Sequence, residues 1–287
     1  VNIVLDYLLI FGVWIFPAMG IAGAAIAPPL SMVAALAAYC ALIARESHDR
    51  RFRIIRGWRL DPVLFSRIIR FGLPNGVQFF LDMAGFTVFL LIVGRLGTAA
   101  LAATNIALNI NTLAFMPMIG LGMTVSILVG QHLGRNDAPL AVRCVGSGFH
   151  LTMLYMGTIA LLYVLTPGLF LAPFGLYSQP GAYDEIRGLA EVLLRFVAIY
   201  SLFDALTIVF ASAIKGAGDS RFVMYMVSGL SLGLLIIPSY LAVEVFGAGI
   251  LAGWTIATVY VSVLGVAFYL RFRSGKWKTM RVIEHPG

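Results

Sequence analysis

Three aspartates, Asp6, Asp82 and Asp204, lie inside long apolar stretches of the chain. A carboxylate in the hydrocarbon core of a membrane costs several kcal/mol, so it normally faces a protein-lined cavity on an ion or substrate path. A carboxylate in such a place can bind a cation or exchange a proton. The sequence therefore predicts ion chemistry inside a membrane, and the surrounding segments have to provide the cavity.

Polar residues recur at helical spacing in three of the apolar stretches. Residues three or four positions apart share one face of a helix. The three predicted faces comprise Asn75, Gln78, Asp82 and Gly85; Asn105, Asn109, Thr112 and Met116; and Tyr200, Asp204 and Thr207. A shared internal cavity accommodates these faces best. The alternative is that the amides and hydroxyls form interhelical hydrogen bonds worth about 1 kcal/mol each, and for Asn105, Asn109 and Thr112 both interpretations stand.

Asp82 and Asp204 lie near the middle of their stretches, and no lysine or arginine lies at matching depth to pair with them. Each could be a neutral carboxyl bonded to a neighbour. Intramembrane carboxylates are functional by default, however, so we interpret both as ion-coupling groups that take up H⁺ or Na⁺. A Na⁺ site at Asp82 and Asp204 is one form of this prediction.

Composition indicates the class of protein. The chain is 60% hydrophobic and 11% charged, with a mean hydropathy of +0.94, whereas about a quarter of the residues of soluble domains are charged. Apolar runs of about 20 residues can cross a membrane as helices. We predict an all-α, polytopic membrane helix bundle with about eight such helices, near 2–18, 21–44, 68–93, 99–130, 145–166, 190–213, 222–243 and 248–270.

The basic residues follow the alternation of these spans. A net charge of +7 could indicate a nucleic-acid partner. If the loop after the second span is cytoplasmic, however, all 20 lysines and arginines except Arg95, Arg187 and Arg195 lie on the cytoplasmic side. This is the positive-inside bias of membrane proteins. It predicts cytoplasmic ends, including a tail at 273–287, and no nucleic-acid partner.

One polar stretch divides the chain. Residues 45–64 are rich in arginine and indicate a cytoplasmic linker between two helices at 1–44 and six helices at 65–272. The first apolar run has no initiator methionine, so we expect it to start inside a helix. The sequence contains no phosphate-binding loop, zinc-ligand cluster or nucleophile elbow. We therefore predict neither an ATP-driven pump nor an enzyme, and no cofactor.

Several motifs resemble those of one membrane protein family in order and in content. They are Pro117-Met-Ile-Gly-Leu-Gly-Met-Thr-Val-Ser-Ile-Leu-Val-Gly-Gln131-His-Leu-Gly134 followed by Ala141, Asp204 followed by Lys215-Gly-Ala-Gly-Asp219, and Asn2-Ile-Val-Leu-Asp6 followed by Gly12 and Pro17-Ala-Met-Gly20. The chain resembles the NorM-like branch of the multidrug and toxic compound extrusion (MATE) family over nearly its whole length. The resemblance implies helices five to twelve of a twelve-helix, two-lobe transporter, with 1–44 in the N-terminal lobe and 65–272 forming the C-terminal lobe.

The resemblance also implies roles for single residues. In the C-terminal lobe of the family, an acidic residue eight positions after a proline and an aspartate on the tenth helix contribute to cation binding, and Asp82 and Asp204 match them. An asparagine and an aspartate one turn apart on the fifth helix take part in ion coupling, and Asn2 and Asp6 match them. Two departures stand out: Pro28 replaces a threonine of the family pattern, and the acidic residue of the first helix lies outside the chain.

By this resemblance we expect a secondary antiporter that exports organic cationic or amphipathic compounds in exchange for Na⁺ or H⁺ by alternating access. The expected setting is the bacterial inner membrane. The expected partners are small organic cations, membrane lipid and the four N-terminal helices of the same protein. One alternative is a lipid-linked sugar flippase of the same superfamily, which would be expected to carry cationic residues at mid-depth. The other is a membrane enzyme or a structural subunit, which predicts clustered catalytic residues at one face or no interior polar stripe.

Overall fold

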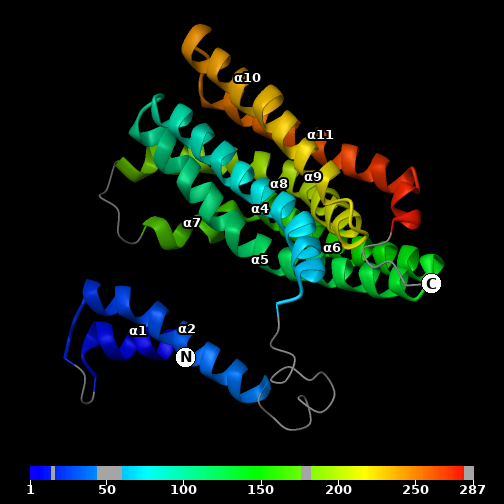
Figure 1. The fold of residues 1–287 in the computed structure, drawn as a ribbon. Coiled ribbons are helices and arrows are strands. Elements are labelled where there is room, and N and C mark those ends of the chain that lie inside the picture. The colour runs from blue at the N-terminus through cyan, green and yellow to red at the C-terminus, as the bar shows by residue number, and fades with distance from the viewer. Residues whose placement is uncertain (14–16, 44–59, 176–181, 281–287) are drawn as a thin grey trace. The chain divides into compact units, whose positions relative to one another are not determined.

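The computed structural model describes residues 1–13, 17–43, 60–175 and 182–280 (Figure 1). Within these ranges every regular element is a helix, which confirms the all-α prediction for the described part of the chain. The chain forms two compact units, Val1–Phe65 and Ser66–Gly287.

The first unit contains two helices that pack on each other, α1 (Asn2–Phe11) and α2 (Ile21–Ile43). Gly12 ends α1 in the left-handed conformation, with φ of 67°, which glycine adopts without steric cost. The predicted first span, 2–18, is therefore wrong. A helix of this length rises about 15 Å, half the ~30 Å of a hydrocarbon core. The predicted second span agrees with α2.

Six further helices are long and apolar enough to cross a membrane, which together with α2 makes seven in the described chain. They are α4 (Pro62–Gly94), α5 (Thr98–Gly134), α6 (Ala138–Leu165), α8 (Ala182–Gly216), an interrupted helix at Ser220–Val245, and α11 (Ile250–Arg273). Each matches one predicted span, so seven of the eight predicted spans are confirmed. A short helix, α7 (Pro167–Gly175), falls between two of them.

α4 begins inside the range that the sequence predicted as linker. Its first residue is Pro62, and the carboxylate of Asp61 accepts hydrogen bonds from the backbone N–H groups of Val63 at 2.8 Å and Leu64 at 3.3 Å. A carboxylate at this position satisfies backbone donors that have no partner within the helix. The greater part of the predicted linker, residues 45–59, lies outside the described residues.

The helix between residues 220 and 245 is not a regular α-helix. It consists of α9 (Ser220–Leu230), the π-helical η1 (Ser231–Ile236), α10 (Ile237–Tyr240) and the π-helical η2 (Leu241–Val245), which follow one another as one rod in Figure 1. Pro238 lies at the start of α10 and has no backbone N–H to donate, which disturbs the regular hydrogen-bond ladder. π-Helical turns are rare and occur frequently at functional sites.

α8 is central to the second unit and packs against α5, α6 and α11. Small residues bring the backbones of α5 and α8 close together: Gly216 lies against the main chain of Ser126, and Gly122 lies against Ile208 and Ser212. A Cβ on Gly216 would collide with the carbonyl oxygen of Ser126. This is the small-residue packing of membrane helices, in which close backbones replace bulky side chains.

An aromatic cluster ties four helices together. The Trp254 side chain on α11 is 1% exposed, and its Nε1–H donates to Oγ1 of Thr104 on α5 at 3.2 Å. Its ring stacks on Tyr200 of α8, with centroids 6.3 Å apart, and meets Phe89 of α4 edge-on at 6.4 Å. Since Tyr200 lies one helical turn before Asp204, this anchor holds the segment that carries the carboxylate.

An ion pair connects the end of α11 with the turn between α8 and α9. Nε and Nη2 of Arg271 donate to Oδ2 of Asp219 at 2.9 and 2.7 Å, and both side chains are largely buried. Beyond it, the short helix η3 (Lys276–Thr279) stacks Trp277 on Phe272, with centroids 4.9 Å apart. The first part of the predicted tail therefore packs against the bundle, and residues 281–287 lie outside the described residues.

The close contact between α5 and α8 predicts that a methyl group added at Gly216 destabilises the protein, whereas one added at a more open glycine does not. Gly216→Ala should lower the thermal unfolding midpoint of the detergent-purified, full-length protein, because overpacking costs about 1–3 kcal/mol. Gly146→Ala is the matched control, since a Cβ there meets no atom within 4 Å and gains about 1 kcal/mol of helix propensity. Equal effects of the two substitutions would show that the close backbone approach does not limit stability.

Candidate cation-binding site

Side chains from three helices interact at the carboxylate of Asp82, which lies half-buried on α4. Tyr260 on α11 donates its hydroxyl proton to Oδ1 of Asp82 over 3.5 Å. The amide of Gln78, one turn earlier on α4, also hydrogen-bonds the carboxylate, and the ammonium group of Lys215 on α8 attracts it electrostatically. The carboxylate therefore has two neutral donors and one cation around it.

Lys215 lies in the last turn of α8. Its Nζ donates to Oε1 of Gln78 at 3.4 Å, so the Gln78 amide bridges the ammonium group and the Asp82 carboxylate. The sequence did not predict a basic residue near Asp82, and Lys215 interacts with this carboxylate electrostatically without a direct ion pair. The physical reason is the length of the lysine side chain, which carries the charge away from the position of its own backbone.

Asp204 is half-buried on α8, on the same helical face as Lys215 and about three turns before it. The two carboxylates, Asp204 and Asp82, interact electrostatically, and Asp204 also interacts with the buried Tyr200. Thr207 donates to the carbonyl of its own helix at Phe203, at 3.1 Å. The structure thus brings the predicted faces of α4 and α8 together at the two carboxylates.

A close contact between α4 and the interrupted helix lies one turn beyond Asp82. Oγ of Ser231, the first residue of η1, lies so near Gly85 that a Cβ at this glycine would collide with it. Ser231 also hydrogen-bonds Tyr260, whose hydroxyl reaches Asp82. Carboxylate and hydroxyl oxygens are the donors that hard cations prefer, so Asp82, Asp204, Tyr260 and Ser231 could hold Na⁺.

A cavity of about 650 Å³ has Lys215 in its lining. Besides Lys215, its polar lining comes from α4, α5 and the start of α9, and consists of Asn75, Ser126, Gln131 and Ser220. Nδ2 of Asn75 donates to the carbonyl of Phe71 at 3.2 Å, while its Oδ1 is buried and has no hydrogen-bond partner among the described residues. Asn75 shares one face of α4 with Gln78 and Asp82, and Lys215 donates to Gln78, so two lining residues of the cavity are connected to the Asp82 cluster.

The predicted polar face of α5 lies apart from the carboxylates. Asn105, Asn109 and Thr112 are exposed on the second unit. Nδ2 of Asn109 donates to the Asn105 carbonyl at 2.9 Å, and Oγ1 of Thr112 donates to the Leu108 carbonyl at 2.8 Å. Both bonds stay within α5, so in the described structure Asn109 and Thr112 do not tie two helices together. A polar face on an apolar helix needs water or protein against it inside a membrane.

Asn2 and Asp6 belong to the first unit. They lie one turn apart on α1, and both are half-buried. Pro28, which replaces the threonine of the family pattern, lies inside α2 next to Pro29, so this position offers no side-chain oxygen. Participation of Asn2 and Asp6 in ion coupling stays a prediction.

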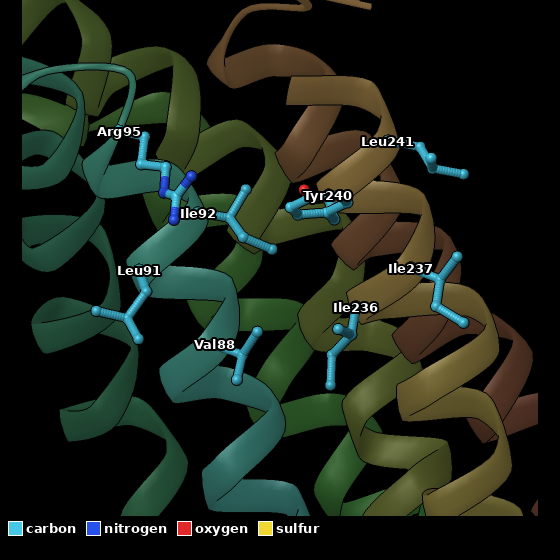
Figure 2. Close-up of a pocket in the computed structure, with 8 residues that line it drawn as sticks. All are labelled: Val88, Leu91, Ile92, Arg95, Ile236, Ile237, Tyr240 and Leu241. Atoms are coloured by element: carbon cyan, nitrogen blue, oxygen red, sulfur yellow. The ribbon is translucent and has the colours of Figure 1, made fainter. Parts of the chain in front are cut away.

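A second cavity, of about 330 Å³, lies between α4 and the interrupted helix (Figure 2). Figure 2 shows Ile92 and Tyr240 projecting into the space between the two rods, with Arg95 at one end. Arg95 pairs with Glu244 at 2.9 Å. The other lining residues are apolar: Val88, Leu91, Ile236, Ile237 and Leu241. This groove is therefore suited to apolar groups, and the ion chemistry belongs to the polar cluster.

Three side chains of the cluster, Lys215, Tyr260 and Ser231, are not among the residues predicted from sequence. The sequence did contain a signal for Lys215, because it lies eleven positions after Asp204 and this spacing returns to the same helical face. Tyr260 and Ser231 had none. Each is one of several hydroxyl residues on an apolar helix, and only tertiary packing determines which of them faces Asp82.

Membrane-spanning helices that enclose two carboxylates and a lysine define a polytopic membrane protein with a charged interior site. The MatE family model matches residues 74–241, a range that includes Gln78, Asp82, Asp204, Lys215 and Ser231. The chain belongs to the MatE family, which confirms the resemblance drawn from the sequence motifs.

Relatives carry a consistent description. The chain is 30% identical over 277 residues to a probable multidrug resistance protein NorM of Mesorhizobium japonicum, covering 94% of this chain and 58% of that protein. It is 27% identical over 288 residues to a protein of the same description from Thermotoga maritima, covering 98% and 59%. The chain thus spans less than two thirds of the length of these relatives.

Solved structures have the same fold. An outward-facing multidrug resistance MATE family transporter of the MOP superfamily superposes with a TM-score of 0.84 at 18% identity, covering 97% of this chain and 60% of that one. A MOP superfamily transporter from Pyrococcus furiosus gives a TM-score of 0.81 at 19% identity, covering 97% and 61%. At such identities the likeness shows the fold alone.

The contact between Gly85 on α4 and Ser231 on η1 predicts that a second substitution can restore stability lost by the first. Gly85→Ala should lower the thermal unfolding midpoint of the purified full-length protein, because the new methyl group collides with the Ser231 hydroxyl. Adding Ser231→Ala removes that oxygen and should restore part of the loss, with an interaction free energy of about 0.5–3 kcal/mol in a double-mutant cycle. Additive effects of the two substitutions would contradict the contact.

Proposed function

We propose that the full-length protein is a cation-coupled antiporter, which exports organic cationic or amphipathic compounds by alternating access in exchange for Na⁺ or H⁺. The observation that carries this proposal is the electrostatic interaction between Asp82 and Asp204 inside membrane-spanning helices. Two like charges in a medium of low dielectric are unfavourable until a cation or a proton neutralises one of them. A binding event with such a large local effect can shift the balance between two conformations.

The proposed roles follow from the contacts. Asp82 and Asp204 take up the coupling ion, while Tyr260 and Gln78 orient the Asp82 carboxylate. The polar side chains on the predicted faces line the route of the ion and the substrate: Asn75, Gln78, Asn105, Asn109, Thr112, Tyr200 and Thr207. The bound ion weakens the attraction of the cluster for an organic cation, and by linkage the organic cation weakens ion binding to the same extent.

Relatives and charge distribution support the wider setting of this proposal. The NorM relatives are described as probable multidrug resistance proteins of bacteria, which favours organic drug-like substrates and the inner membrane. The distribution of lysine and arginine between the spans favours a cytoplasmic C-terminus. In this setting the chain provides helices five to twelve of the transporter, and Asn2 and Asp6 provide a second ion-coupling position in the N-terminal lobe.

The charge of the cluster disfavours transport of lipid-linked sugars. When ionised, Asp82, Asp204 and Lys215 carry a net formal charge of −1. An anionic pyrophosphate headgroup would be repelled by such a site, whereas a cation is attracted. The single lysine is already engaged with Gln78 and Asp82, so it does not form the basic cavity that the flippase alternative requires.

The test uses the full-length protein in inside-out membrane vesicles. We expect uptake of a fluorescent organic cation when a Na⁺ gradient or a pH gradient is imposed, and the gradient that drives uptake identifies the coupling ion. Asp82→Asn and Asp204→Asn should each reduce this uptake by an order of magnitude or more, because neither variant keeps both carboxylates.

The matched control is Asp184→Asn, which removes the same charge from an exposed position in the first turn of α8. This variant should transport at the rate of the unmodified protein. Membrane insertion of all variants is compared by their yield in the membrane fraction. Full gradient-driven uptake in both Asp82→Asn and Asp204→Asn would eliminate the proposed coupling site.

A further inference from the structure

The side chain of Lys215 interacts with the Asp82 carboxylate, and ion coupling by the two carboxylates alone does not require a lysine there. Its backbone is in the last turn of α8, yet its side chain extends to Gln78 instead of remaining in a solvated loop. The structure describes no ion pair of Lys215 with an acidic side chain within 4.0 Å; the carboxylate that attracts it is Asp82, which it approaches through the Gln78 amide. A cavity lined by Asn75 and Lys215, among others, lies beside the lysine.

The charged and polar groups around the two carboxylates can be counted. Tyr260, Tyr200 and Gln78 supply neutral groups. Among the described residues for which an interaction with either carboxylate is found, Lys215 is the cationic one. Charges in a low-dielectric interior are stable when they are compensated. A lysine within this cluster therefore removes one of the two negative charges that a mobile cation would otherwise have to balance.

We propose that Lys215 is a built-in counter-cation of the Asp82–Asp204 pair, so that the cluster takes up one monovalent cation or proton instead of two. The inference rests on the proposed function and deepens it by fixing the cation capacity of the site. The Gln78 amide carries the interaction, because it accepts from the ammonium group and hydrogen-bonds the carboxylate. A cation that binds Asp82 competes with Lys215 for this carboxylate.

The inference predicts that cation uptake follows the formal charge of the cluster. The experiment measures two quantities on purified full-length protein: radioactive sodium bound at alkaline pH, and protons taken up on transfer from alkaline to neutral pH without sodium. Lys215→Met leaves two uncompensated carboxylates, so it should bind one cation equivalent more per molecule than the unmodified protein. Adding Asp204→Asn to Lys215→Met should remove this extra equivalent.

Two controls separate charge from structure. Lys215→Arg keeps the cation and should bind the same number of equivalents as the unmodified protein. Arg221→Gln removes a cation from an exposed position near the start of α9 and should likewise leave the number unchanged. A merely structural lysine would give variants that differ in stability, and the extra equivalent would not appear in Lys215→Met or vanish in the double variant.

The single variant Asp204→Asn keeps the inference testable even if Lys215→Met does not fold. With Lys215 as counter-cation, the remaining Asp82 carboxylate is already neutralised and the variant should lose the cation equivalent of the cluster. Without a counter-cation it should keep one. Retention of one equivalent in Asp204→Asn, or unchanged binding in Lys215→Met, overturns the inference while leaving antiport intact. No difference between the unmodified protein and a variant that lacks both carboxylates would instead overturn the proposed function.

Discussion

Charge compensation inside membrane-spanning helices is the constraint on which the rest of this structure depends. Asp82 and Asp204 can remain in their segments only if other groups offset their charge or a proton neutralises them. The second unit supplies these groups from several helices: Lys215 from the end of α8, Gln78 from α4 and Tyr260 from α11. Since α4 meets α8 and α11 through these same polar contacts, the charge state of the site also determines part of what holds α4 in place.

The helices on the two sides of the site pack differently. On one side, α5 and α8 pack backbone to backbone at Gly216, next to the Trp254 cluster, which also includes Phe89 of α4. On the other side, α4 lies against a helix with two π-helical segments, in contact with it through Ser231. Packed interfaces tend to have discrete arrangements instead of deforming continuously. Because Asp82 belongs to α4, a change in its charge compensation would act on the contacts of α4 with α8 and α11.

Hydropathy predicted seven of the membrane-spanning helices, because a run of about 20 apolar residues is long enough to cross the hydrocarbon core of a membrane as a helix. The first span was overestimated because a single left-handed glycine, Gly12, ends α1, which average hydropathy does not detect. Helical spacing predicted the polar faces of α4 and α8, and these faces do meet. The predicted polar face of α5, in contrast, is exposed on the same unit. Helical spacing shows which residues share a face of a helix, but it does not show which neighbouring helix that face contacts. Lys215 was not predicted as a site residue. Its backbone lies at the end of a helix, so its charge was assumed to be in solvent.

Antiport requires that the coupling ion and an organic cation are not held together in the same state. A cluster with two uncompensated carboxylates would still attract a second cation after binding the first, and would favour joint occupancy. With Lys215 in the cluster, the empty site carries one net negative charge and the occupied site carries none. Electrostatic attraction for an organic cation then exists only while the coupling ion is absent. The position of the lysine thus favours exchange over joint binding by the same compensation that stabilises the carboxylates.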